Sequence, residues 1–251
     1  MADPSQVVVV WNVRGMNNPA KCNAISNVIS GSGASVVCLQ ETKIQDMTPA
    51  LVRQCLGPAF DRFFYAPAVG TRGGVLLAAK SSGVQLSNPH VTDNSVTAWV
   101  QCLESVGWWF TGVYGPQEDA EKIVFMQELR EIRGLHAGPW MLSGDFNLIV
   151  DPSDKSNDRI NRQMMGRFRR CISDLDMHEV YLNGRRYTWS NERTAPTLEK
   201  LDRVLVSVEW EALYPASFLS ALSTGVSDHC PLHLVLEANL RRGRRFHFET
   251  F

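Results

Sequence analysis

Six polar residues stand at the ends of short apolar segments that have the length and composition of buried strands. Four come at or just after the end of a segment and two just before the start of one: Asn12, Glu41, Tyr114, Asp145, Asp202 and Asp228. In antiparallel neighbours the end of one strand lies beside the start of the next. The six side chains can therefore converge at one edge of the sheets, where sites commonly form.

A polar residue at a strand end is usually a turn former, and each of the six has that explanation when taken alone. Three of them stand in tight polar clusters, at Gly144–Asn147, Gln40–Lys43 and Ser227–His229, which turn formation does not explain. Carboxylates that meet at one spot repel each other unless a cation neutralises them. Oxygen ligands of this kind suit Mg²⁺, with Mn²⁺ as a substitute. The pattern therefore predicts a site for a divalent cation.

The first forty residues predict a parallel βαβ unit. Val7–Asn12 and Val36–Gln40 are the strands, and a helix runs from Asn18-Pro19 to about Ser30 between them. Four later strand-like segments follow without a helix and are expected to be antiparallel: Phe63–Ala66, Val75–Lys80, Ser95–Cys102 and Gly107–Tyr114. Shorter strands are predicted at Trp140–Ser143, Tyr187–Ser190, Val204–Val206 and Leu232–Leu236, and helices at Pro49–Leu56, Glu118–Arg133, Met164–Leu175 and from Ser207 to Tyr214. This mixture favours an α/β protein with mixed sheets and helices outside.

The 251 residues allow one large domain or two small ones. No linker-like segment divides the chain, so we expect a single domain over residues 1–240 and a basic tail over 241–251. No apolar run approaches the roughly 20 residues that a membrane span needs, so no membrane partner is expected. The six cysteines are widely spaced and mostly in apolar runs, which favours buried thiols in a reducing compartment.

The net charge of the whole chain does not indicate a function, but the charge of one segment does. Residues 1–240 carry 21 basic and 25 acidic side chains, whereas residues 159–203 carry ten basic and six acidic ones. A local basic segment is a modest indication of nucleic-acid binding. The chain has no phosphate-binding glycine loop, no Gly-x-Ser-x-Gly sequence and no His-Glu-x-x-His sequence.

The polar clusters carry a resemblance to a known family. Six motifs occur in order: Trp11–Gly15, Leu39–Lys43, Val113–Pro116, Ser143–Asn147, Lys200–Arg203 and Ser227–Pro231. The series resembles the endonuclease/exonuclease/phosphatase superfamily, which includes abasic-site endonucleases, pancreatic-type deoxyribonuclease and inositol polyphosphate phosphatases. Each motif alone is weak, but six in the right order over Val7–Glu237 are a strong signal. The resemblance implies a four-layer α/β sandwich of two mixed sheets packed face to face, with helices outside.

Within that superfamily the chain is most similar to the endonuclease domain of a plant non-LTR (LINE-type) retrotransposon. The pointers are Arg14, the run from Gly144 through Lys155, Met165–Arg169, Arg185–Asn191 and the ending Arg245–Glu249. The resemblance implies an excised piece of a polyprotein that is made in the cytoplasm and acts on chromosomal DNA in the nucleus. Its partners would be the DNA target and, through the missing region, the element's RNA and reverse transcriptase. As an isolated domain it is expected to be a monomer.

The resemblance also implies a role for each site residue. Glu41 would be the main Mg²⁺ ligand, helped by Asn12 and Asp228. Asp145 would orient and deprotonate the attacking water, and Asn147 would hold that water or the phosphate. The remaining catalytic residues would be His229, which faces the phosphate; Asp202, which bonds the far nitrogen of His229; and Tyr114, which donates a hydrogen bond to a phosphate oxygen.

A polar stretch over residues 190–199 is predicted to form the tip of a β-hairpin beside the Asp202 strand. Its sequence suits contact with a narrow DNA groove, and basic residues before it can follow the phosphates. The predicted DNA-binding residues are Arg14, Arg185, Arg186, Asn191 and Arg193. An ordinary surface hairpin is the competing interpretation, but the matching hairpin of retrotransposon relatives helps to select the target.

The sequence therefore predicts a Mg²⁺-dependent endonuclease that nicks DNA and leaves a 3′-hydroxyl, which primes reverse transcription of the element's RNA. One alternative is an abasic-site repair endonuclease, although such enzymes usually have Asn at the position of Arg14. Another is a phosphoesterase for a small substrate such as an inositol phosphate. A scaffold with a dead site is disfavoured because every catalytic position is filled.

Overall fold

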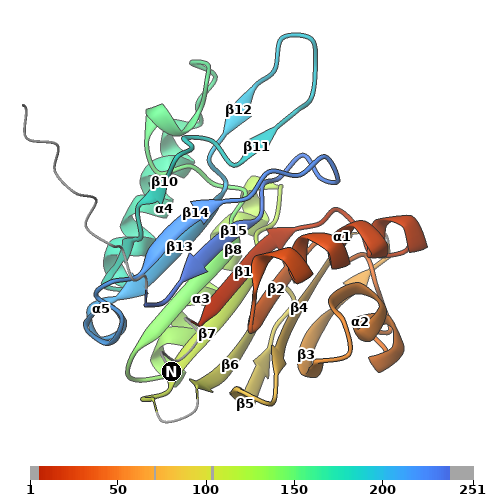
Figure 1. Cartoon of the computed structure of the whole chain (residues 1–251). Helices are drawn as coiled ribbons and strands as arrows, with labels where there is room; N and C mark the ends of the chain where they lie inside the picture. The colour runs from red at the N-terminus through yellow and green to blue at the C-terminus, as the bar shows by residue number, and fades with distance from the viewer. Residues whose placement is uncertain (1–5, 71, 103–104, 238–251) are drawn as a thin grey trace, which may run out of the picture.

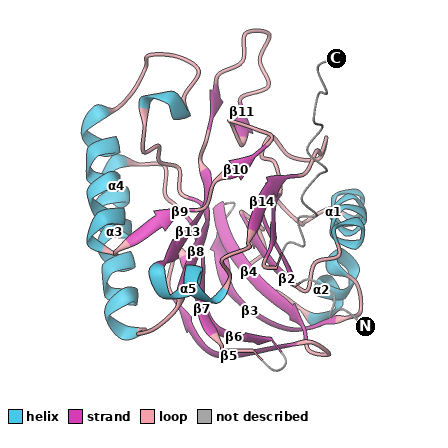
Figure 2. Cartoon of the chain, turned by 60° about the vertical axis from the view of Figure 1, so that its left-hand side comes forward, coloured by secondary structure: helices cyan, strands magenta, loops and turns pink. Residues whose placement is uncertain are grey.

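The computed structural model of the chain describes residues 6–70, 72–102 and 105–237. Two β-sheets pack face to face between two layers of helices, as Figures 1 and 2 show from two sides. Helices α1 (Pro19–Ser32) and α2 (Pro49–Leu56) cover one sheet, and α3 (Asp119–Leu135) and α4 (Arg162–Asp174) cover the other. The predicted four-layer α/β sandwich is confirmed. The predicted basic tail at 241–251 lies outside the described residues.

The first sheet has seven strands in the order β10-β14-β15-β1-β2-β4-β3. Strands β1 and β2 are parallel, and α1 connects them as predicted; the helix begins at Pro19 because Asn18 caps it. The strand bounds are β1 Val7–Asn12, β2 Val36–Gln40, β3 Phe60–Val69, β4 Arg72–Lys80, β10 Leu182–Asn183, β14 Phe218–Ala221 and β15 Leu232–Val235.

The second sheet has six strands in the order β5-β6-β7-β8-β13-β9. Its central pair, β7 and β8, is parallel, and β13 is antiparallel to β8. The bounds are β5 Val84–Val91, β6 Ser95–Cys102, β7 Trp108–Tyr114, β8 Trp140–Asp145, β9 Met177–Glu179 and β13 Asp202–Ser207. A separate hairpin of β11 (Trp189–Ser190) and β12 (Leu198–Glu199) projects from the body, and the short helices are α5 (Val208–Leu213) and the 3₁₀ turn Pro152–Asp154.

Strand β1 explains why the apolar runs of this chain are continuous rather than alternating. Val8 and Val10 face the core between the two sheets, while Val7, Val9 and Trp11 pack under α1 and α2. A strand with core on both sides needs apolar residues at every position, because successive side chains point to opposite faces. None of the helices in the described residues is long and apolar enough to cross a membrane.

The four strands predicted to be antiparallel form two antiparallel pairs, β3 with β4 and β6 with β7. The pairs lie in different sheets, since β3 and β4 belong to the first sheet and β5 to β7 belong to the second. Strand β5 itself was missed because it contains Ser87-Asn88-Pro89 and has an irregular register there. Proline is tolerated in a sheet only at an edge or a bulge, and β5 is an edge strand. Strand β14, only four residues long, was also missed.

Strand register brings the predicted polar strand ends to one edge. Asn12 pairs with Gln40 at the ends of β1 and β2, and Tyr114 pairs with Asp145 at the ends of β7 and β8. Asp202, predicted to precede a strand, is the first residue of β13 and lies directly opposite Asp145. Gly144 allows this arrangement, because its φ is +148° and a Cβ there would lie 2.1 Å from the carbonyl oxygen of Val113.

Candidate active site

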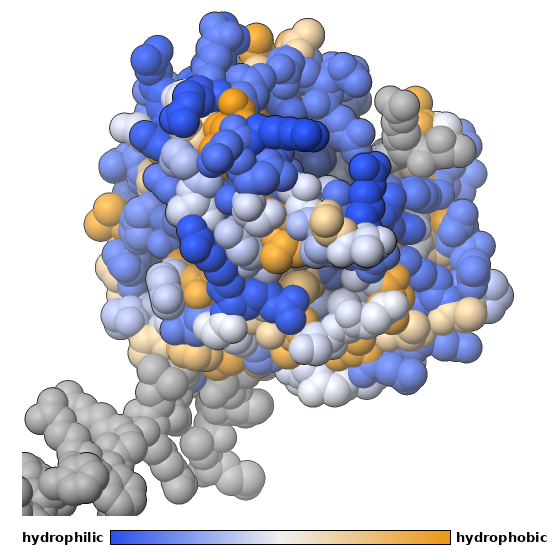
Figure 3. Space-filling view, turned by 90° about the horizontal axis from the view of Figure 1, so that it is seen from above, coloured by the Kyte–Doolittle hydropathy of each residue, from blue (hydrophilic) through white to orange (hydrophobic). Residues whose placement is uncertain are grey.

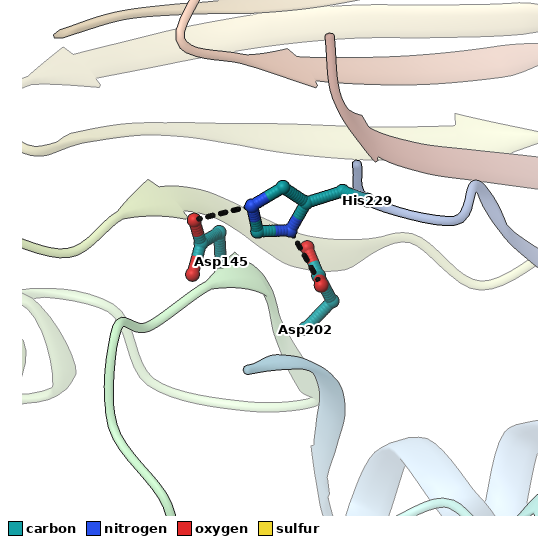
Figure 4. A group of neighbouring side chains, drawn as sticks. All are labelled: Asp145, Asp202 and His229. Carbon is teal, nitrogen blue, oxygen red and sulfur yellow. Dashed lines mark hydrogen bonds and ion pairs between the residues drawn. The ribbon is translucent and has the colours of Figure 1, made fainter. Parts of the chain in front are cut away.

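Asp145, His229 and Asp202 form a buried group at this edge, joined by one hydrogen bond and one ion pair (Figure 4). Their exposed fractions are 1%, 4% and 2%. The Nδ1 atom of His229 lies 2.9 Å from Asp202 Oδ2, and its Nε2 lies 3.7 Å from Asp145 Oδ2. The imidazole ring therefore stands between two carboxylates that extend from neighbouring strands.

Two residues of strand β1 hold Asp145 and His229 in place. Asn12 donates through Nδ2 to Asp145 Oδ2 at 2.8 Å, and the indole of Trp11 donates to the carbonyl oxygen of His229 at 3.1 Å. The other oxygen of Asp145 accepts the backbone N–H of Asn147 at 2.9 Å, while the amide of Asn147 donates to Gly115. Asn12 and Asn147 thus orient Asp145 from both sides.

Burial and mutual charge set the protonation of the pair. Burial raises the pKa of Asp145 to about 6, with the charge of Asp202 adding to the rise and that of His229 opposing it. Burial alone would lower the pKa of His229, but the charges of Asp202 and Asp145 outweigh it and raise the pKa to about 9. Near neutral pH the group therefore holds a carboxylate at Asp145 and a cationic imidazole at His229.

Glu41 and Tyr114 lie beside this group. Glu41 follows β2 in a left-handed backbone conformation, with φ of +51°, and its Oε1 lies 3.1 Å from Lys43 Nζ. Burial and the charges of Glu41 and Asp145 raise the pKa of the Tyr114 hydroxyl well above its ordinary value. Tyr114 therefore remains a hydrogen-bond donor at every physiological pH.

Asp228 is held by two donors. Its Oδ2 accepts from Arg14 Nη1 at 2.5 Å and from the Trp189 indole at 2.8 Å. Half of the Arg14 side chain is exposed, so its guanidinium lies at the boundary between the site and solvent. Trp189 in turn forms a β-bridge with His229, which joins the hairpin to the buried group.

These residues line one pocket of about 310 Å³. Four acidic side chains face it, with Arg14 and His229 as the lining cations; the lining residues are Asn12, Arg14, Glu41, Tyr114, Gln117, Asp145, Asn147, Trp189, Glu199, Leu201, Asp228 and His229. The donors are oxygens of carboxylates and amides, which is the set that Mg²⁺ and Mn²⁺ prefer. The pocket therefore fits a hard divalent cation, and Glu41 with Asp228 would hold it.

The buried group itself is a poorer cation site, although its three ligand atoms lie within 4.8 Å of one another. A metal ion there would have to displace the bond between His229 and Asp202. Imidazole is also a softer ligand than Mg²⁺ selects. Asn12 was predicted to help hold the metal; its NH₂ group donates to Asp145, and its Oδ1 accepts the backbone N–H of Arg14 at 3.0 Å.

Of the predicted DNA-binding residues, Arg14 lines the pocket itself. Arg185 contacts the Sγ of Cys230, and Arg186 donates to the carbonyl oxygen of Ser153 at 3.0 Å; both line an adjoining hollow of about 210 Å³. Arg193 is exposed in the hairpin loop, whereas Asn191 accepts the backbone N–H of Thr197 at 2.9 Å and so closes that loop. Figure 3 looks down on this edge and shows a mostly hydrophilic face.

Several lining residues were not among the predicted ones. Trp189 and Glu199 are register partners in the hairpin, and both face the pocket. The Oε1 atom of Glu199 lies 2.8 Å from Lys155 Nζ. Gln117 lines the pocket from the loop after Tyr114. The sequence offered one sign that Trp189 lines the site. It stands at the start of the predicted hairpin, and a hairpin that begins beside the site places its first residues there.

Comparison with known proteins gives consistent matches. The Endonuclease/Exonuclease/phosphatase family model matches residues 9–229. An exodeoxyribonuclease of Bacillus subtilis is 24% identical over 252 residues, which cover 91% of this chain and 98% of the relative. Two solved structures share the fold and cover 92% of this chain. They are an AP endonuclease from Leishmania major (TM-score 0.71, 17% identity, 88% of that chain) and the endonuclease domain of TRAS1, a telomere-specific non-LTR retrotransposon (TM-score 0.68, 14% identity, 97% of that chain).

Replacing Asp145 or His229 should strongly slow turnover without unfolding the protein. We expect Asp145→Asn and His229→Ala each to lower the rate of phosphodiester cleavage by about 10²–10⁴-fold, as for the loss of one acid–base group. The matched control is Asp176→Asn, an exposed aspartate just before β9, whose Met177 pairs with Ser207 at the end of β13 away from Asp202. Rates are measured on a plasmid substrate and folding by thermal unfolding. A variant that retains near-normal activity would exclude its residue from the site.

The rate should depend on pH through both partners. It should rise as Asp145 loses its proton near pH 6 and fall as His229 loses its proton near pH 9. Asp202→Asn removes the carboxylate that raises the pKa of His229, so the alkaline limb should move to lower pH by about one to three units. Single-turnover rates against pH measure both limbs. An alkaline limb that stays in place in Asp202→Asn would show that His229 does not govern it.

Proposed function

Because this chain belongs to the Endonuclease/Exonuclease/phosphatase family, we propose that it is a metal-dependent endonuclease that nicks one strand of DNA and leaves a 3′-hydroxyl. Family membership makes it a nuclease or phosphoesterase. The observation that carries the proposal is the pairing of an ionisable Asp145 with a cationic His229 at the wall of an acidic pocket. Residues 1–240 would form this single endonuclease domain.

Each residue of the buried group has a task in cleavage. Asp145, ionised at neutral pH and held by Asn12 and Asn147, accepts a proton from the attacking water. His229 stays cationic beside Asp202 and stabilises the charge that builds on the phosphate. Tyr114 remains protonated and donates a hydrogen bond to a phosphate oxygen.

A divalent cation, when bound by Glu41 and Asp228, supplies polarisation of a phosphate oxygen and stabilisation of the departing 3′-oxygen. Before a cation binds, each of these carboxylates is partly neutralised by one basic side chain, Glu41 by Lys43 and Asp228 by Arg14. Mg²⁺ is the proposed ion, with Mn²⁺ as a substitute.

The finer proposal is a retroelement enzyme whose nick primes reverse transcription. Its support is the sequence similarity at Arg14, Gly144–Lys155 and Arg185–Asn191, together with a hairpin that projects beside the pocket. Such an enzyme would act in the nucleus on chromosomal DNA. The reverse transcriptase and the element's RNA would be its partners through the rest of a polyprotein.

Abasic-site repair is the second candidate, because similar proteins include an AP endonuclease. Arg14 argues against it. In this chain its guanidinium is bound to Asp228 at the rim of the pocket, a position at which abasic-site enzymes usually have Asn.

Nicking of supercoiled plasmid should require Mg²⁺ or Mn²⁺. Without a cation the acidic pocket repels a phosphate, so excess chelator should stop the reaction and added Mg²⁺ should restore it. Gel conversion of supercoiled to open-circular plasmid measures this. Glu41→Gln, which keeps the size of the side chain, should shift the Mg²⁺ requirement upward by about tenfold or more. Full activity in excess chelator would disprove the metal requirement.

Undamaged DNA should be cut about as fast as DNA with one abasic site. The comparison uses two duplexes of identical sequence, one of which carries the lesion, under single-turnover conditions. A preference of several hundredfold for the lesion would assign the protein to repair. Rapid release of phosphate from inositol phosphates, without nicking of either duplex, would assign it to the phosphatases.

A further inference from the structure

Helix α4 exposes a face that carries arginines and no acidic residue over its first nine positions. Arg162, Arg167, Arg169 and Arg170 are exposed, while Met164, Met165, Phe168 and Cys171 pack into the core. The first acidic residue is Asp174 in the last turn, and Arg130 of α3 pairs with it at 2.8 Å. A solvated helix face normally mixes charges of both signs, because like charges three or four residues apart destabilise a helix.

Three of these arginines are unpaired. The side chains of Arg162, Arg167 and Arg170 make no hydrogen bond or ion pair with any residue that the structure describes. Elsewhere in the described chain most basic side chains near the site are engaged, as Arg14, Lys43 and Lys155 are. The α4 arginine face, defined as Arg162, Arg167 and Arg170, therefore offers its full charge to an external anion.

Direct contacts link helix α4 to the edge that holds the pocket. Arg169 donates to the carbonyl oxygen of Val150 at 2.6 Å, and Arg186 donates to Ser153, three residues further along the same segment. That segment continues into Ser156, which pairs with Leu198 of the hairpin at 2.9 Å. A chain of direct contacts thus leads from the hairpin at the pocket, across residues 150–156, to α4.

We propose that the α4 arginine face binds backbone phosphates of duplex DNA, on the arm of the duplex that extends beyond the pocket. The proposal rests on the proposed function, in which DNA is the substrate. Arg162 and Arg170 are eight residues apart, about 12 Å along the helix axis, a span that covers several phosphates of a duplex. The guanidinium group matches phosphate geometry. The exposed residues of α4 include no aromatic side chain on which unpaired bases stack, which favours a duplex over single-stranded RNA.

The test compares binding of two duplexes in an Asp145→Asn background, which prevents cleavage. One is a 10-bp duplex closed by a loop, which covers the cleft alone, and the other is a 40-bp duplex, which supplies long arms. The variant is Arg162→Gln with Arg170→Gln. The matched control is Arg53→Gln with Arg62→Gln, two exposed arginines, one on α2, which packs on the first sheet, and one on β3, the edge strand of that sheet. Fluorescence anisotropy measures Kd over a range of salt concentrations, and thermal unfolding verifies folding.

We expect the α4 variant to weaken binding of the 40-bp duplex about tenfold and to reduce the salt slope by about two, one for each lost phosphate contact. Binding of the 10-bp duplex should change less than about twofold, and the control variant should change neither. Equal losses on both duplexes, or no loss on the 40-bp duplex, would overturn the proposal. So would a 40-nucleotide single-stranded RNA that depends on these arginines more strongly than the duplex does.

A nicking assay distinguishes failure of this proposal from failure of the proposed function. The Arg162→Gln/Arg170→Gln variant with Asp145 intact should cut the short duplex at the wild-type rate when substrate is saturating. If the intact protein cuts no DNA but the two arginines still support long-duplex binding, the α4 proposal stands and the endonuclease proposal fails. If the protein nicks DNA and the variant binds both duplexes normally, the reverse holds.

Discussion

The site depends on two buried carboxylates that the sheet holds opposite each other. Asp145 ends β8, Asp202 begins β13, and the antiparallel register makes them direct partners. Two negative charges this close and this buried would destabilise the fold unless a cation lay between them. His229 supplies that cation from the loop before β15, and the Trp11 indole holds its backbone in place. The cation that the fold needs between the two carboxylates is therefore the same His229 imidazole that the proposed reaction uses.

The same register explains why the other polar residues surround this group. Tyr114 pairs with Asp145 at the end of the parallel strands β7 and β8, and Asn12 ends β1 in the facing sheet. The two sheets must pack closely for Asn12 to reach Asp145 at 2.8 Å. Gly112 allows that approach, because a Cβ there would lie 2.2 Å from the Sγ of Cys38 in the other sheet. The pocket thus requires both sheets.

The fold class and the family could be predicted from the sequence because they rest on local patterns. Apolar runs with polar ends are visible in the chain, and β1 has the bounds predicted for it. Strand β5 could not be predicted, because Pro89 and its polar neighbours are tolerated only through its place at the edge of a sheet. The partners of the charged side chains could not be predicted from the sequence either. The bond between Arg14 and Asp228 joins residues 214 positions apart, and no local pattern announces it. The roles assigned to the site residues stay predictions.

We propose that this pocket hydrolyses a DNA phosphodiester on the 3′-oxygen side of the phosphate. The direct measurement is the chemistry of the nicked end. Plasmid nicked by the protein in Mg²⁺ is offered, without any phosphatase treatment, to a DNA polymerase and a labelled nucleotide, and Asp145→Asn protein is the parallel control. We expect wild-type nicks to be extended at once, because each carries a 3′-hydroxyl, and the Asp145→Asn sample to gain no label. Nicks that accept label only after removal of a 3′-phosphate would contradict it.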